Sequence, residues 1–326
     1  MKKQNFLFVD IVSSIFLLIL FVANFLGLLY ILEGNIIFSV LASIFIVICY
    51  YFLIQLLVKN KELMYKNKFM HSSSLLWGLY LILFFASFIL MSHFVNIEFN
   101  AKKEIQKDAL AKLSVVDSAS TIYKERSKKS IEDFEADLKS KLKTYKNSGS
   151  NQLRNTLTTN PYSIAPEILN DRKYLNVNQV ASARLTPMIK NIETNSANFD
   201  LTIKKNTDKY KSTFNNWNRL SLVGTYVKLN EYVDQSIKLI NDKIVELPAD
   251  NTPIVINYNK DTLFLNNPKK INQKFEPNYT ITIIIVLLIN IFILIPFFSE
   301  KVRSYTTTSR TKNDGTTNNN GTSIEL

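Results

Sequence analysis

Four runs of 20 or more residues in this 326-residue chain contain no Asp, Glu, Lys or Arg. They cover residues 11–32, 36–58, 75–95 and 279–298 and consist mainly of Leu, Ile, Val and Phe. About 20 helical residues, each rising about 1.5 Å, cross a hydrocarbon core about 30 Å thick. A soluble amphipathic helix would carry a polar stripe, which these runs lack. The sequence therefore predicts an all-α membrane protein with four transmembrane helices, three N-terminal and one C-terminal.

Basic residues beside the predicted spans set their orientation, because short cytoplasmic loops are enriched in Lys and Arg. The short loop at 33–35 has no basic residue and carries Glu33. The opposite side has ten basic residues: Lys2, Lys3, Lys59, Lys61, Lys66, Lys68, Lys301, Arg303, Arg310 and Lys312. We therefore expect a multi-pass protein of the cell (inner) membrane with both termini in the cytoplasm. Residues 96–278 would then be extracytoplasmic, or periplasmic in a cell with two membranes.

Most of the excess positive charge lies in the external segment. Residues 96–278 contain 29 Lys and Arg against 21 Asp and Glu, a net +8 of the chain's +12. Long domains are translocated largely regardless of charge, so this balance leaves the orientation unchanged. The expected location argues against nucleic acid as a partner. We expect contact with the lipid bilayer, and the basic surface either binds anionic lipid or envelope polymer or simply solvates long helices.

The external segment shows two long helical patterns, at about 97–147 and 187–247. No Gly or Pro occurs between Gly78 and Gly149, so the third span is expected to continue into the first long helix. Both patterns place side chains on one stripe at spacings of three and four residues. The first stripe is Ala109, Leu113, Val116, Ser120 and Tyr123 and, after a break in phase near Ser127, Ile131, Phe134, Leu138 and, past Lys141, Tyr145. The second includes Ile189, Ile192, Phe199, Ile203, Tyr210, Trp217, Leu220, Gly224 and Val227.

Two long helices joined by a tip at 148–186 most simply form an antiparallel coiled-coil hairpin about 75 Å long. Ser, Asn, Thr and Gly interrupt the stripes, which leaves room for further helices. Four-helix packing, by refolding of the hairpin or by formation of a homo-oligomer, is therefore an alternative. Pro187 is expected in the first turn of the second helix.

Two segments depart from the helical pattern. Residues 253–266 alternate apolar and polar residues on both sides of "NKD", which predicts a small β-hairpin near the membrane. Residues 299–326 are rich in Thr, Asn and Gly, which predicts a disordered cytoplasmic tail.

The sequence offers little material for catalysis or metal binding. The only histidines, His71 and His93, are separated by the third span, and the single Cys49 lies within the second. These residues cannot form a zinc set or a disulfide. No nucleophile motif or phosphate-binding glycine loop is present. We therefore expect no cofactor, no metal and no enzymatic activity.

Polar residues within or beside the spans are the remaining site candidates. These are Asp10, Asn24 and Asn290 inside the membrane and His93 at the membrane exit, where it could sense pH. Intramembrane polar groups usually face protein and hydrogen-bond between helices. We expect Asn24 and Asn290 to approach each other at similar depth and to tie the first helix to the fourth.

Three classes of function fit these features. The first is a scaffold whose extracytoplasmic arm docks components of an envelope complex. The second is a transmembrane sensor that binds a ligand or partner through the arm and signals through a separate cytoplasmic protein. The third is a subunit of a channel or transport assembly, although the spans show neither repeats nor charged rings.

Overall fold

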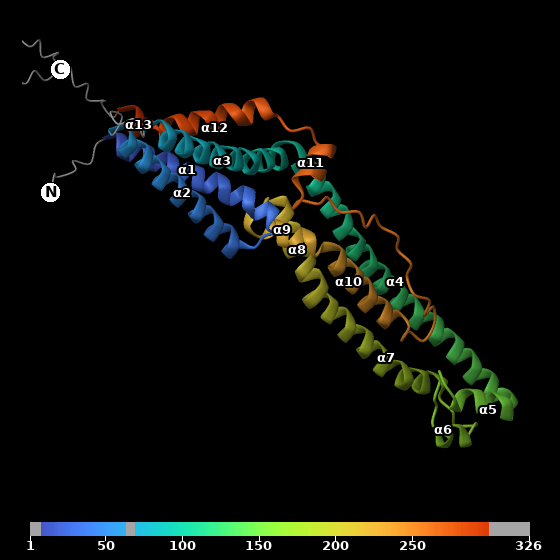
Figure 1. The fold of residues 1–326 in the computed structure, drawn as a ribbon. Helices are drawn as coiled ribbons and strands as arrows, with labels where there is room; N and C mark the ends of the chain where they lie inside the picture. The colour runs from blue at the N-terminus through green and yellow to red at the C-terminus, as the bar shows by residue number, and fades with distance from the viewer. Residues whose placement is uncertain (1–7, 63–68, 300–326) are drawn as a thin grey trace, which may run out of the picture.

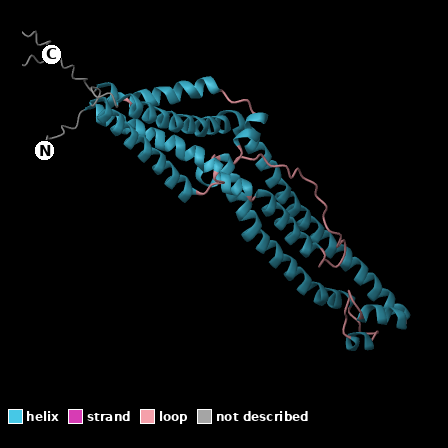
Figure 2. Cartoon of the chain, viewed as in Figure 1, coloured by secondary structure: helices cyan, strands magenta, loops and turns pink. Residues whose placement is uncertain are grey.

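The computed structural model describes residues 8–62 and 69–299. Outside these ranges lie the predicted tail beyond residue 299 and eight of the ten basic residues used for orientation: Lys2, Lys3, Lys66, Lys68, Lys301, Arg303, Arg310 and Lys312. Within them the chain forms helices and loops without a β-strand (Figure 2). Figure 1 shows two parts joined end to end, a bundle of apolar helices and a long helical arm.

The bundle contains α1 (Phe8–Ile31), α2 (Ile36–Glu62), α3 (Phe69–Asn96) and α12 (Tyr279–Ile293), which pack on one another. The first three are long and apolar enough to cross a membrane. α12 is shorter, about 22 Å at 1.5 Å per residue, and is followed by α13 (Ile295–Ser299). The helix breaks between α12 and α13, just before Pro296. Proline has no N–H for a helical hydrogen bond, and its ring clashes with the preceding turn.

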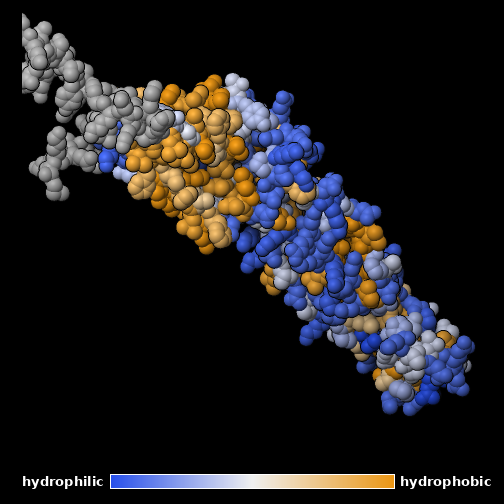
Figure 3. All heavy atoms as spheres, viewed as in Figure 1, coloured by the Kyte–Doolittle hydropathy of each residue, from blue (hydrophilic) through white to orange (hydrophobic). Residues whose placement is uncertain are grey.

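The bundle is apolar on its outer face and carries polar residues inside. Leu18, Phe45 and Ile82 are among its strongly exposed side chains, whereas Asn24 and Ser87 are fully buried. Figure 3 shows the apolar surface as one broad band over these helices, next to a largely hydrophilic arm. Lipid tails solvate apolar side chains, so polar groups collect at helix contacts. The apolar outer face and the polar helix contacts of the bundle are consistent with a membrane protein.

A single helical path leads from the bundle into the arm. α3 continues through the π-helical segment η1 (Ile97–Ala101) into α4 (Lys102–Ser148), which is about 70 Å long. Most of the predicted first stripe is buried along α4, with contacts to α7, α8 and α10. At the tip, α5 (Asn151–Thr158) and α6 (Pro166–Asn170) enclose a small separate core around Leu138, Leu157 and Leu185.

The single return helix predicted at 187–247 is wrong. The observed segments are α7 (Val177–Phe199), η2 (Asp200–Lys204), α8 (Lys205–Asn215), α9 (Arg219–Val227) and α10 (Leu229–Ile244). The helix starts at Val177, so Pro187 lies inside it rather than in its first turn. The chain turns at Trp217, whose φ of 50° is incompatible with a continuing helix.

This turn adds a third helical layer to the arm. α10 runs outward again beside α4, so α4 packs against α7 and α8 and also against α10 (Figure 1). The phase of the stripe changes as well: Leu220 and Val227 are half exposed, whereas Leu222 and Val223 are fully buried. The two-helix hairpin is therefore corrected to three helical segments side by side.

The predicted β-hairpin at 253–266 is also wrong. This segment runs back toward the bundle as an extended loop and ends at α11 (Pro268–Lys274). Its backbone forms hydrogen bonds with side chains of neighbouring helices instead of with a second strand. Asn241 of α10 accepts from the Ile254 N–H at 2.7 Å and donates to the Ile254 carbonyl at 3.0 Å. Lys112 of α4 donates to the Asp261 carbonyl at 2.6 Å.

We expect Asn241→Ala to release this segment locally. The substitution removes both hydrogen bonds of Ile254, which is buried, and should cost about 1–2 kcal/mol. Hydrogen exchange of the Ile254 amide should accelerate roughly tenfold or more, while the amides of α4 keep their protection. Asp242→Ala, at the exposed neighbouring position, is the matched control. Unchanged exchange at Ile254 in the Asn241 variant would contradict this account of the loop.

Candidate functional site

The bundle and the arm are joined through buried polar contacts at the end of α3. His93, near the end of α3, is 1% exposed, and its Nε2 lies 2.7 Å from the carbonyl oxygen of Leu265. A carbonyl only accepts hydrogen bonds, so Nε2 carries the proton. The predicted membrane-exit candidate thus holds the returning extended loop against α3. Its role in pH sensing stays a prediction.

Glu98 is the centre of this junction. It lies in η1, its side chain is 8% exposed, and it accepts hydrogen bonds from three segments of the chain. Tyr30 of α1 donates its hydroxyl at 3.0 Å, and the indole Nε1 of Trp217 donates at 3.0 Å. Arg219 at the start of α9 donates from Nε at 2.7 Å and Nη2 at 2.9 Å, one to each carboxylate oxygen. We name Tyr30, Glu98, Trp217 and Arg219 the Glu98 cluster.

Further contacts reinforce the same junction. Asn96 donates to the side chain of Asn272 at 2.8 Å and to the carbonyl of Phe275 at 2.9 Å. Gly34, in the loop between α1 and α2, has φ of 81° and packs so closely on α9 that an added Cβ would lie 2.9 Å from the backbone nitrogen of Gly224. Bundle and arm are therefore joined on several sides of α3.

The Glu98 carboxylate is held in its charged form. Burial raises the pKa of Glu98, but hydrogen bonds from Arg219, Trp217 and Tyr30 lower it by more. The pKa therefore lies below the ordinary value of 4.5. A depressed carboxyl pKa contributes stability above the unfolded-state pKa, and this contribution is lost as the pH falls through the folded-state pKa.

The lowered pKa of Glu98 predicts how the effect of Glu98→Gln on stability depends on pH. The stability difference between wild type and variant should be constant near neutral pH, where both folded and unfolded Glu98 are charged. It should shrink as the pH falls below about 4.5. Denaturant unfolding of both proteins in detergent across this range measures the difference. A difference that grows on acidification would contradict the assignment.

The two asparagines predicted to lie within the membrane form hydrogen bonds with α3 instead of with each other. Asn24 donates to the hydroxyl of Ser87 at 3.1 Å, and Tyr80 donates to Asn290 at 2.7 Å. Ser87 and Tyr80 are about two helical turns, roughly 10 Å, apart along α3. No hydrogen bond between Asn24 and Asn290 occurs among the described residues. The two asparagines therefore tie α1 and α12 separately to α3, while the Ser13 hydroxyl joins α1 to α12 directly by donating to the Ile293 carbonyl at 2.9 Å. Asn24 Oδ1 is buried without a partner in the described chain.

The remaining candidates have simpler surroundings. Asp10 lies in the first turn of α1, where its backbone carbonyl accepts from the hydroxyl of Ser14 at 2.8 Å. Cys49 is half-buried in α2 and forms no disulfide. Within residues 8–62 and 69–299, no three His, Cys, Asp or Glu side chains are grouped as they would be around a metal ion.

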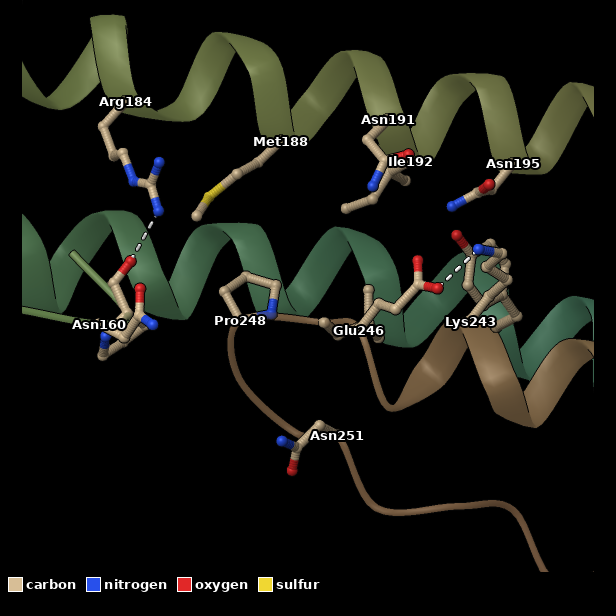
Figure 4. Close-up of a pocket in the computed structure, with 13 residues that line it drawn as sticks. Asn160, Arg184, Met188, Asn191, Ile192, Asn195, Lys243, Glu246, Pro248 and Asn251 are labelled. Atoms are coloured by element: carbon tan, nitrogen blue, oxygen red, sulfur yellow. Dashed lines mark hydrogen bonds and ion pairs between the residues drawn. The ribbon is translucent and has the colours of Figure 1, made fainter. Parts of the chain in front are cut away.

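A cavity of about 490 Å³ lies in the arm between α7, the end of α10 and the loop that follows it. Figure 4 shows side chains from one face of α7 opposite this loop. We name this space the arm cavity; residues that line it include Tyr123, Arg184, Met188, Asn195, Glu246 and Asn251. Such a volume is typical of ligand-binding sites, which range over about 300–1,000 Å³. No local pattern in the sequence indicates this site, because its walls come from distant segments.

Comparison with known proteins provides no relative from which to transfer a function. The chain matches no protein-family model, no curated protein and no solved structure.

Proposed function

We propose that this is a non-enzymatic integral membrane protein whose extracytoplasmic arm serves as a docking scaffold of an envelope complex. α1, α2 and α3 are three of its spans, and α12 with α13 provides the fourth. Both termini lie in the cytoplasm, and the arm projects from the outer face of the membrane. The topology rests on the distribution of Lys and Arg in the sequence.

The Glu98 cluster is the observation that carries this proposal. A scaffold must hold its docking surface at a defined position relative to the membrane. The cluster links the outer end of α1, the beginning of the arm and the α8–α9 turn through one buried carboxylate. Such bidentate, charge-assisted hydrogen bonds are geometrically specific. The arm is thus fixed to the bundle as one unit.

The orientation has a direct test. A reporter enzyme that works only outside the cytoplasm is fused after Ser150, at the far end of α4. We expect it to be active, and a second reporter that works only inside should be active when fused after residue 299. The reverse pattern would overturn the topology.

Docking is tested by crosslinking in native membranes followed by mass determination. We expect crosslinked species well above the 37.6 kDa of the chain, with crosslinked peptides from residues 102–250 joined to another protein. Crosslinks confined to the bundle would favour a channel-type oligomer. A chain that stays monomeric under these conditions would contradict the docking role.

The arm cavity favours a sensor as a second candidate. A ligand between α7 and α10 would contact helices that pack on α4, and α4 continues into α3 without a non-helical break. A sensor would change the spacing between arm and bundle when the cavity is filled. A scaffold would keep this spacing.

A further inference from the structure

We propose that the arm cavity binds an extended polypeptide segment whose carboxylate pairs with Arg184. This inference rests on the proposed docking role and gives the docked partner a chemical class. The carboxylate is either an acidic side chain or the C-terminus of the segment. Three features of the cavity support it: buried polar groups without partners, asparagines at a particular spacing, and an unbalanced positive charge.

Two polar groups of the cavity have no hydrogen-bond partner within the described residues. Tyr123, on α4, is fully buried, and its hydroxyl is unpaired. The Nε of Arg184 is buried and unpaired, although its Nη2 donates to the carbonyl of Pro161 at 2.9 Å. A buried unpaired polar group is destabilising, and such groups are rare in folded proteins. The Nε–H of Arg184 can only donate, so a ligand beside it must bring an acceptor oxygen. The Tyr123 hydroxyl can donate or accept, and its ring packs on Phe199 near the opposite end of α7.

Asparagines line the cavity at a spacing that suits an extended backbone. Asn191 and Asn195 are four residues apart on α7 and lie on its cavity side in Figure 4. The two asparagines are about 6 Å apart along the axis of α7, which is close to the roughly 6.7 Å that two residues of an extended chain cover. A carboxamide offers both donors and an acceptor, as a peptide unit does. Alternate peptide units of a segment lying along α7 can therefore pair with successive asparagines.

The charges and the apolar walls define the segment further. Lys243 is paired with Glu246 at 2.6 Å, which leaves Arg184 as the unbalanced charge of the cavity. A guanidinium binds a carboxylate more strongly than a neutral carbonyl. Met188 and Ile192 offer apolar surface between the polar groups, and methionine adapts to side chains of different shape. We therefore expect an apolar residue next to the carboxylate.

Affinity selection tests the proposal on the full-length protein in nanodiscs. The probe is a pool of hexapeptides, half with free and half with amidated C-termini, and a soluble N-acetylglucosamine oligomer is tested in parallel. We expect enrichment of peptides that place a carboxylate beside an apolar residue. Loss of binding on amidation assigns the carboxylate to the C-terminus; binding kept by amidated acidic peptides assigns it to a side chain. Absence of peptide binding at millimolar concentration, or binding of the sugar oligomer alone, would overturn the proposal.

Two variants and a control locate the binding. Asn195→Leu and Arg184→Gln should each weaken the selected peptide tenfold or more. Asn198→Leu, at an exposed position of α7 outside the cavity, should leave the affinity within twofold. Thermal unfolding of all three variants verifies that they fold. Equal affinities of wild type and both cavity variants would place the peptide elsewhere and refute the assignment.

The crosslinking experiment separates this inference from the docking role. If the cavity variants lose the peptide and the large crosslinked species also disappears, both hold. If the complex forms in native membranes but no peptide binds the purified protein, the cavity assignment fails and the docking role stands. If no complex forms with the wild type, the docking role itself fails.

Discussion

Glu98→Ala is expected to lower the free energy of unfolding by about 2–4 kcal/mol. The substitution removes the shared acceptor of the Glu98 cluster and leaves the buried Tyr30 hydroxyl and Trp217 indole N–H without a partner. Each such group costs about 1–3 kcal/mol. Arg219 is 46% exposed and can turn to water, so the loss stays below that of a fully buried ion pair. Denaturant unfolding in a fixed detergent measures the change.

Glu104→Ala provides the matched control on the same helical path. Glu104 pairs with Lys274 on the surface, where both side chains are about half exposed. Exposed ion pairs contribute about 0–1 kcal/mol, so this variant should unfold almost as wild type does. Equal losses in the two variants would show that the Glu98 cluster has no special role.

Gly27→Leu is expected to separate α1 from α3 and to cost about 3 kcal/mol or more. A Cβ at Gly27 would lie 2.5 Å from the backbone carbonyl oxygen of Leu90, which cannot move aside as a flexible side chain would. Small residues permit this close approach between helices in membranes, and overpacking a tight contact is strongly destabilising. We expect a lower unfolding temperature and faster proteolysis in detergent.

Gly78→Leu separates packing from the general effect of adding leucine to a membrane helix. Gly78 is on α3, and nothing lies within 4 Å of a Cβ built there. Its replacement should change the stability by less than about 0.5 kcal/mol. A Gly27 variant as stable as the Gly78 variant would contradict the observed contact between α1 and α3.

Local patterns in the sequence predicted the bundle and the first long helix, but not the direction of the chain beyond α8. Apolar runs and the stripe on α4 are properties of neighbouring residues. Helical spacing is the same whether a chain continues or turns back, so the periodicity alone predicts a continuous helix through Trp217. The "NNWN" at 215–218 is rich in turn-forming asparagine and was the available signal for the break.

The junction and the cavity depend on contacts between residues far apart in the sequence. Glu98 and Arg219 are 121 residues apart, and no periodicity links them. The alternation at 253–266 predicted a β-hairpin, whereas the segment forms a loop without a strand. The alternation could not show that Asn241, rather than a second strand, satisfies the buried backbone of Ile254. Tertiary packing decides which groups form hydrogen bonds with such a backbone segment.

The attachment of the arm to the bundle is the central claim, and a spin-label distance tests it most directly. Labels are placed at Ile37 on α2 and Lys128 on α4, both exposed, in a Cys49→Ala protein in nanodiscs. We predict one narrow distance distribution for wild type and a clearly broader one for Glu98→Ala. A broad distribution in wild type, or an equally narrow one in the variant, would contradict the claim that the Glu98 cluster fixes the arm to the bundle.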